Sequence, residues 1–110
     1  MTYPNYQDIE VPLLVEIYKR GGKVRPSERG GYPKDIYETM ADFFQLSKEE
    51  RERDIEVGGK VEPKWNNMVR WARRKLKDNG YLVSPSKHGV WEISDEGKVH
   101  VENLIKNRKI

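Results

Sequence analysis

Apolar residues recur at helical spacing along most of the chain and change to short, strand-like clusters near its C-terminal end. The first apolar stripe predicts a helix over about Gln7–Arg20, or one that begins nearer Val11 so that Pro12 lies in its first turn. Gly21–Gly22 should end this helix. Lys23–Arg25 is then expected to form a short edge strand.

A second apolar stripe predicts a helix over about Pro33–Phe44. Ser47 and Glu50 have the spacing of a capping box, so a further helical segment is expected over Lys48–Asp54. This segment is highly charged and should lie at the surface. Gly58, Gly59 and Pro63 are expected to break the regular secondary structure before the next helix.

The most polarised helix is predicted over Lys64–Asn79. At about 100° per residue, one face is apolar and the other carries cations and amides. The apolar face consists of Trp65, Met68, Val69, Ala72 and Leu76. Six basic residues and a single acid occupy this stretch. A helix of this kind suits a DNA major groove, and a plain solvated amphipathic helix is the alternative.

The apolar pattern beyond this helix predicts a strand at Tyr81–Val83, a turn at Pro85–Gly89 and a returning strand at Val90–Ile93. Ser94 should cap a last helix, whose end at about residues 106–110 is expected to fray. The fold class is therefore mainly α with a small antiparallel β-hairpin, an α+β fold. Three helices followed by a hairpin predict a winged helix-turn-helix, with the hairpin as the wing, in one domain spanning residues 1–110.

The candidate DNA contacts lie on the polarised helix and at the tip of the predicted wing. Asn67 and Arg70 are the candidates for base edges, and Arg73, Arg74 and Lys77 are the candidates for phosphates. The full predicted set is Lys64, Asn66, Asn67, Arg70, Arg73, Arg74, Lys77, Ser86, Lys87 and His88. For the wing residues a plain hairpin turn is the alternative. Trp71 is expected to belong to the core or to pack between helices, and contact with a base methyl group or a displaced base is its alternative role.

Composition narrows the function classes. The chain of 110 residues has a net charge of +3 and no cysteine, which excludes disulfides and thiolate metal sites. Positive charge concentrates in residues 63–110, where eleven Lys and Arg accompany five Asp and Glu. His88 and His100 have no partner at ligand spacing, so we expect no metal site, cofactor or catalytic group. The absence of a long apolar run predicts a soluble, cytoplasmic protein that does not enter a membrane.

Several segments together resemble the N-terminal domain of Mrr-type restriction proteins. They are PNYQDIEVPLL near the start, LSKEERERDIEVGGK, WNNMVRWARRKLKDNGYL and HGVWEISDEGK. The resemblance runs from about Tyr3 to Leu104. It implies a winged-helix module that binds duplex DNA and is joined to a nuclease domain or subunit that cuts modified DNA.

The sequence departs from that family pattern because it leaves no room for a nuclease fold. It is therefore expected to be either a standalone relative or a piece of a larger endonuclease, and not itself an enzyme. Two other functions remain open from the residues: a winged-helix protein-interaction module and a small, dimeric transcriptional regulator.

Overall fold

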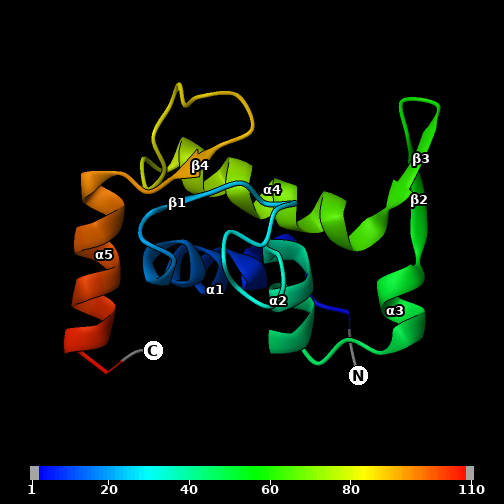
Figure 1. The fold of residues 1–110 in the computed structure, drawn as a ribbon, viewed down its shortest axis with the longest axis horizontal. Helices are drawn as coiled ribbons and strands as arrows, with labels where there is room; N and C mark the ends of the chain where they lie inside the picture. The colour runs from blue at the N-terminus through cyan, green and yellow to red at the C-terminus, as the bar shows by residue number, and fades with distance from the viewer. Residues whose placement is uncertain (1–2, 109–110) are drawn as a thin grey trace.

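The computed structural model describes residues 3–108, which form five helices and two small antiparallel sheets. The helices are α1 (Tyr6–Lys19), α2 (Ile36–Phe43), α3 (Lys48–Glu52), α4 (Lys64–Asp78) and α5 (Asp95–Lys106). The strands are β1 (Lys23–Val24), β2 (Asp54–Val57), β3 (Lys60–Pro63) and β4 (Trp91–Glu92). This arrangement confirms the predicted α+β class (Figure 1).

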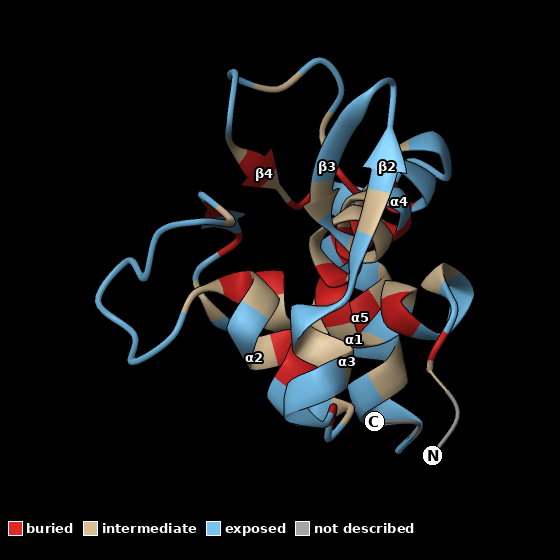
Figure 2. Ribbon diagram, turned by 90° about the vertical axis from the view of Figure 1, so that its right-hand side faces the viewer, coloured by how far each residue is buried: buried red, intermediate tan, exposed pale blue. Residues whose placement is uncertain are grey.

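The core lies where α1 and α4 pack against each other, with α2 closing one side and α5 the end (Figure 1). Its buried side chains come mainly from α1 and α4: Ile9, Leu13, Leu14, Ile17, Trp65, Val69, Ala72 and Leu76. In Figure 2 these helices show buried surface where they meet and exposed surface outside. Trp65 is buried, as its place on the apolar face predicts, Trp91 is buried too, and Met68 is partly buried against the core.

Helix α1 begins earlier than the alternative start near Val11 would require. Asn5 accepts a hydrogen bond from the backbone N–H of Asp8 at 3.1 Å, and Asp8 accepts one from the N–H of Asn5 at 3.2 Å. This capping box fixes the first turn at Tyr6. Pro12 therefore lies inside the helix, so the prediction that it occupies the first turn is wrong.

A β-hairpin replaces the end of the predicted charged helix. Helix α3 stops at Glu52, and β2 pairs with β3 in register from Asp54↔Pro63 to Val57↔Lys60. Gly58 and Gly59 both have positive φ, as a two-residue hairpin turn requires. The prediction of helix through Asp54 and of a simple chain break at the glycines is wrong, because Gly-Gly between alternating apolar residues is itself a hairpin signal.

The returning strand of the predicted wing has a partner on each edge. Strand β4 pairs mainly with β1, through Lys23↔Glu92 and Val24↔Trp91. The strand expected at Tyr81–Val83 pairs with the returning segment as predicted, through the antiparallel bridge Leu82↔Ile93 and backbone bonds from Val83 N–H to Glu92 and from Ser94 N–H to Tyr81. The short edge strand predicted near Lys23 is confirmed, and it pairs with the edge of β4 opposite to the one that residues 81–83 occupy.

The remaining ends and connections follow local signals. Ser94 caps α5 by accepting from the N–H of Gly97 at 3.0 Å. The expected fraying of residues 106–110 falls partly on 109–110, which lie outside the described residues. None of the helices in residues 3–108 is long and apolar enough to cross a membrane.

Candidate nucleic-acid interface

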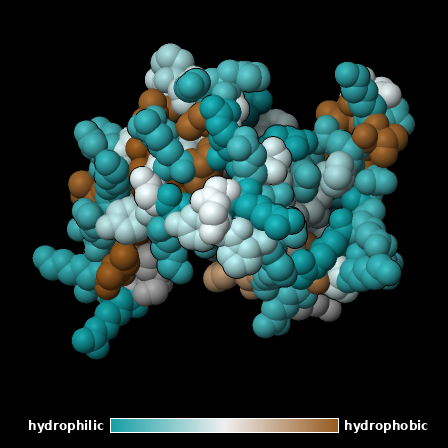
Figure 3. Space-filling model, in the orientation of Figure 1, coloured by the Kyte–Doolittle hydropathy of each residue, from teal (hydrophilic) through white to brown (hydrophobic). Residues whose placement is uncertain are grey.

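Two projections rise from the same side of the molecule, one near each end of α4. The β2–β3 hairpin stands at the N-terminal end of α4, and the loop of residues 83–90, here called the wing loop, stands over its C-terminal half (Figures 1 and 2). The space-filling view shows an open recess between them (Figure 3). The face of α4 that looks into this recess is the one turned away from the core.

The outward face of α4 carries amide and guanidinium groups because the helix repeat places its apolar residues on the opposite side. Arg74 is exposed, and its guanidinium lies 5.3 Å from the ring centre of Trp71. Asn67 and Arg70 are only partly exposed. Basic side chains thus occur along most of the length of α4. The first turn of this helix contains no acidic residue.

The two candidates for base edges share one acidic partner. Glu62, at the foot of β3, accepts a hydrogen bond from Asn67 Nδ2 at 3.0 Å and forms an ion pair with Arg70. Sequence reasoning did not identify Glu62. The signal available was its position immediately before the helix, but only the hairpin brings its carboxylate over the outward face of α4. Its charge balances Arg70 and holds that side chain in one place.

Arg73 lies on the flank of α4 that faces the β1–β4 sheet. Its guanidinium sits 5.8 Å from the ring centre of Trp91, and its buried Nε finds no hydrogen-bond partner among residues 3–108. Lys77 follows one turn later and is partly exposed. A buried guanidinium N–H without a partner in the protein is costly, and this Nε is too deeply covered for an external anion to reach it.

The other predicted contacts do not all reach the recess. Lys64 places its ammonium 4.7 Å from the ring centre of Tyr3, on the opposite flank of α4. Asn66 lines a small pocket against α2. In the wing loop, Lys87 and His88 are exposed, whereas Ser86 is partly covered. The structure thus joins Asn67 and Arg70 through Glu62, places Arg73 and Arg74 over Trp91 and Trp71, and sets Lys64 and Asn66 against Tyr3 and α2.

Trp71 is a surface residue with 45 % exposure. Its ring packs at a tilt against Tyr6 of α1, with 6.5 Å between ring centres. The expectation that it packs between helices is confirmed by this contact, although the indole stays outside the core.

A family model described as the Mrr N-terminal domain matches residues 6–103. The chain belongs to this family. The resemblance to the N-terminal domain of Mrr-type restriction proteins is thereby confirmed. Comparison with curated proteins and with solved structures found no match.

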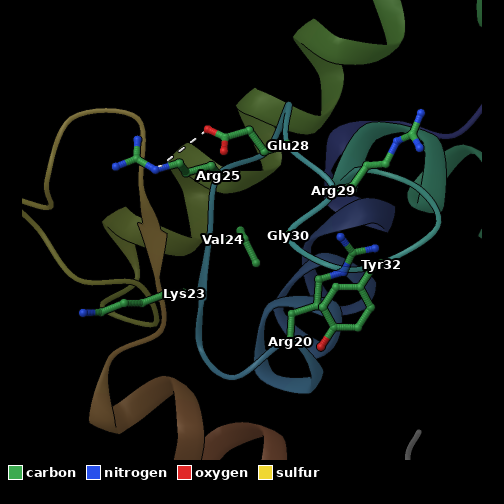
Figure 4. Close-up of a pocket in the computed structure, with 8 residues that line it drawn as sticks. All are labelled: Arg20, Lys23, Val24, Arg25, Glu28, Arg29, Gly30 and Tyr32. Atoms are coloured by element: carbon green, nitrogen blue, oxygen red, sulfur yellow. Dashed lines mark ion pairs between the residues drawn. The ribbon is translucent and has the colours of Figure 1, made fainter.

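This Mrr N-terminal domain has further cations beside its wing loop. A pocket of about 140 Å³ is lined by Arg20, Lys23, Val24, Arg25, Glu28, Arg29, Gly30 and Tyr32. Figure 4 shows Lys23 and Arg25 pointing toward the wing loop and Arg29 pointing the other way. Arg20 is held by Glu16 at 2.8 Å and by Thr39 at 2.8 Å. The pocket therefore gathers no converging set of cations.

Lys23 and Arg25 instead extend the basic surface next to the wing loop. Arg25 Nη1 lies 3.4 Å from the position that a Cβ on Gly89 would occupy, so the Arg25 side chain packs against the wing loop. Lys23 and Arg25 flank the buried Val24 of β1. Because side chains alternate along a strand, this spacing in the sequence could have predicted that both point outward.

Proposed function

We propose that this domain binds duplex DNA as a winged helix-turn-helix, with α4 in the major groove and the wing loop against the backbone. The observation that carries the proposal is the recess between the two projections, whose floor is the cationic outward face of α4. A major groove about 12 Å wide accepts one α-helix. Family membership supports the further proposal that the domain serves as the recognition part of a restriction system that senses modified DNA.

The residues divide into two roles. Asn67 and Arg70, near the N-terminal half of α4, are placed to reach base edges, where Asn pairs with adenine and Arg with guanine. Arg73, Arg74 and Lys77 with Lys87 of the wing loop are placed to bind phosphates. Arg73 is only partly exposed, so within the proposed set the exposed Arg74 and Lys87 are the more accessible phosphate contacts.

The test is a fluorescence-anisotropy titration of matched duplexes, unmodified and carrying methyladenine or methylcytosine, at two salt concentrations. With about five phosphate contacts, affinity should fall several hundred-fold between 50 and 200 mM salt. Salt-independent binding, or no binding to any duplex at low salt, would overturn the proposal. Preference for one modified duplex would support the role in restriction.

A protein-interaction function is the second candidate, and one observation favours it. A groove of about 410 Å³ between α1 and α2 is lined by Val11, Pro12, Val15, Glu16, Lys19, Met40 and Phe43. Phe43 is 63 % exposed there, unusual for a large aromatic side chain. If this groove carries the function, Phe43→Ser will abolish partner binding while Arg70→Gln leaves it intact.

A further inference from the structure

The β2–β3 hairpin is a ribbon with almost no core behind it. Of its eight strand residues only Ile55 and Glu62 are partly buried, and Val61 is 69 % exposed. A two-stranded hairpin alone is only marginally stable in water, so the packing of its foot on α3 and α4 must hold it upright. Exposed valines on such a projection indicate a contact surface.

The register of the hairpin assigns its side chains to two faces. Residues paired directly opposite share a face, and successive residues alternate between faces. Ile55↔Glu62 and Val57↔Lys60 therefore share one face, and Glu56↔Val61 and Asp54↔Pro63 share the other. Glu62 reaches Asn67 and Arg70, so its face is the one that overlooks the outward side of α4. We call it the inner face.

The charges are sorted between these faces. Asp54 and Glu56 lie on the outer face, turned away from α4, whereas Lys60 lies on the inner face near the tip. Glu62, the inner acid, is already paired with Arg70. The inner face therefore presents one lysine beside two apolar residues, with its acid paired to Arg70, and a lysine at this place suits a nucleic-acid backbone.

We propose that the hairpin is a second wing, which contacts the DNA backbone through Lys60 and a groove edge through Val57. Helix α4, with 15 residues, is about 22 Å long. The hairpin and the wing loop near its two ends can therefore contact the DNA backbone beyond either end of a helix that lies in the major groove. A valine facing the groove provides an apolar contact for base methyl groups. This inference rests on the proposed DNA binding.

The test compares Lys60→Gln with Lys48→Gln, which makes the same charge change on α3, where the side chain is 88 % exposed and outside the recess. Anisotropy titrations on one duplex are run from 50 to 200 mM salt. Losing one phosphate contact should reduce the salt slope by about 0.9 and weaken binding at least several-fold at low salt. Lys48→Gln should keep the wild-type slope. Equal behaviour of the two variants would overturn the inference.

A second pair of variants separates a lost DNA contact from a general loss of hairpin folding. Val57→Ser and Val61→Ser make the same change on the inner and outer faces, at nearly the same height on the ribbon. Loss of affinity by Val57→Ser alone supports the second wing, and equal loss by both, or by neither, overturns it. Failure of the wild-type domain to bind duplex DNA at low salt would instead refute the proposed function itself.

Discussion

At the scale of single residues, Glu62 has the greatest influence on the candidate interface. Its carboxylate is bonded to both Asn67 and Arg70, the two side chains best placed to reach bases. An acid at this position repels phosphates while it fixes the direction of the arginine. In the proposed complex with DNA it would therefore favour selective contacts over indiscriminate attraction.

Glu62→Gln should consequently strengthen binding to unrelated duplexes by about threefold at low salt and narrow the difference between sequences, because Arg70 becomes free to pair with phosphates. Titrations on a panel of duplexes measure both effects. Glu56→Gln is the matched control, since it removes the same charge from the outer face of the hairpin. Weaker binding of Glu62→Gln to every duplex would contradict this role.

Tyr3 has a second residue-scale consequence, which concerns stability. Burial raises the pKa of its hydroxyl to about 12, from 10.0 in a free side chain. Below pH 10 the hydroxyl is protonated in both folded and unfolded chains. Between pH 10 and 12 only the unfolded chain ionises there, so this contribution to stability is lost as pH rises. Denaturant titrations should show a shallower decline for Tyr3→Phe than for wild type in that window.

The hydroxyl of Tyr3 also finds no hydrogen-bond partner among residues 3–108. Tyr3→Phe should therefore keep or raise the free energy of unfolding at pH 7, because it removes a buried polar group without exposing a partner. A clear loss of stability at neutral pH would show that the hydroxyl is satisfied in solution.

At the scale of elements, the anchoring of α5 depends on one close backbone approach. Gly97 lies in the first turn of this helix, and a Cβ there would sit 2.2 Å from the carbonyl oxygen of Tyr81. The segment that leads into the wing loop can thus run directly beneath the helix. No side chain larger than hydrogen fits without displacing one of the two.

Gly97→Ala should lower the free energy of unfolding by about 2–3 kcal/mol, despite the better helix propensity of alanine. Urea denaturation followed by circular dichroism measures the change. Lys98→Ala, at an exposed neighbouring site, should stay within about 0.5 kcal/mol of wild type. Equal stability of Gly97→Ala and wild type would mean that α5 shifts freely on the body.

Elements with strong local signals could be predicted from the sequence, and those set by distant partners could not. The periodicity of Lys64–Asp78 and the caps at Ser47 and Ser94 place their helices within a residue or two. The partner of β4 is a strand almost seventy positions earlier, which no local pattern specifies. The β2–β3 hairpin had a local signal, but the adjoining charged helix obscured it.

For the candidate interface, the sequence predicted which residues point outward but not which residues they contact. The outward position of Arg70 and Arg74 follows from helix geometry. The pairing of Arg70 with Glu62 and the position of Arg73 over Trp91 depend on how separate elements pack, which periodicity does not contain. Whether these residues bind DNA remains a prediction.

At the scale of the whole molecule, the distribution of charge matters more than its sum. The net charge is only +3, yet residues 63–110 carry an excess of six positive charges. Residues 1–62 carry three net negative charges, so the two halves of the chain differ in sign. An uneven charge distribution of this kind would orient an approaching polyanion toward the positive side.

Position should accordingly outweigh net charge in binding. Arg70→Gln with Arg74→Gln should reduce affinity for duplex DNA more than tenfold at 50 mM salt. Lys98→Gln with Lys106→Gln removes the same charge from α5, outside the recess, and should change affinity less than threefold. Anisotropy titrations measure the loss of affinity for each double variant. Similar losses from both would indicate attraction by overall charge alone.

The foot of the hairpin has a consequence for how such domains can diversify. The carbonyl oxygen of Arg53 accepts a hydrogen bond from the N–H of Lys64 at 2.9 Å, so the chain leaves and re-enters the body at one point. A ribbon of another length could therefore replace residues 54–63 with α3 and α4 in place, provided that it keeps the contacts of Glu62 with Asn67 and Arg70. If the proposed second wing contacts DNA, recombination at this junction would alter the target preference on an unchanged scaffold.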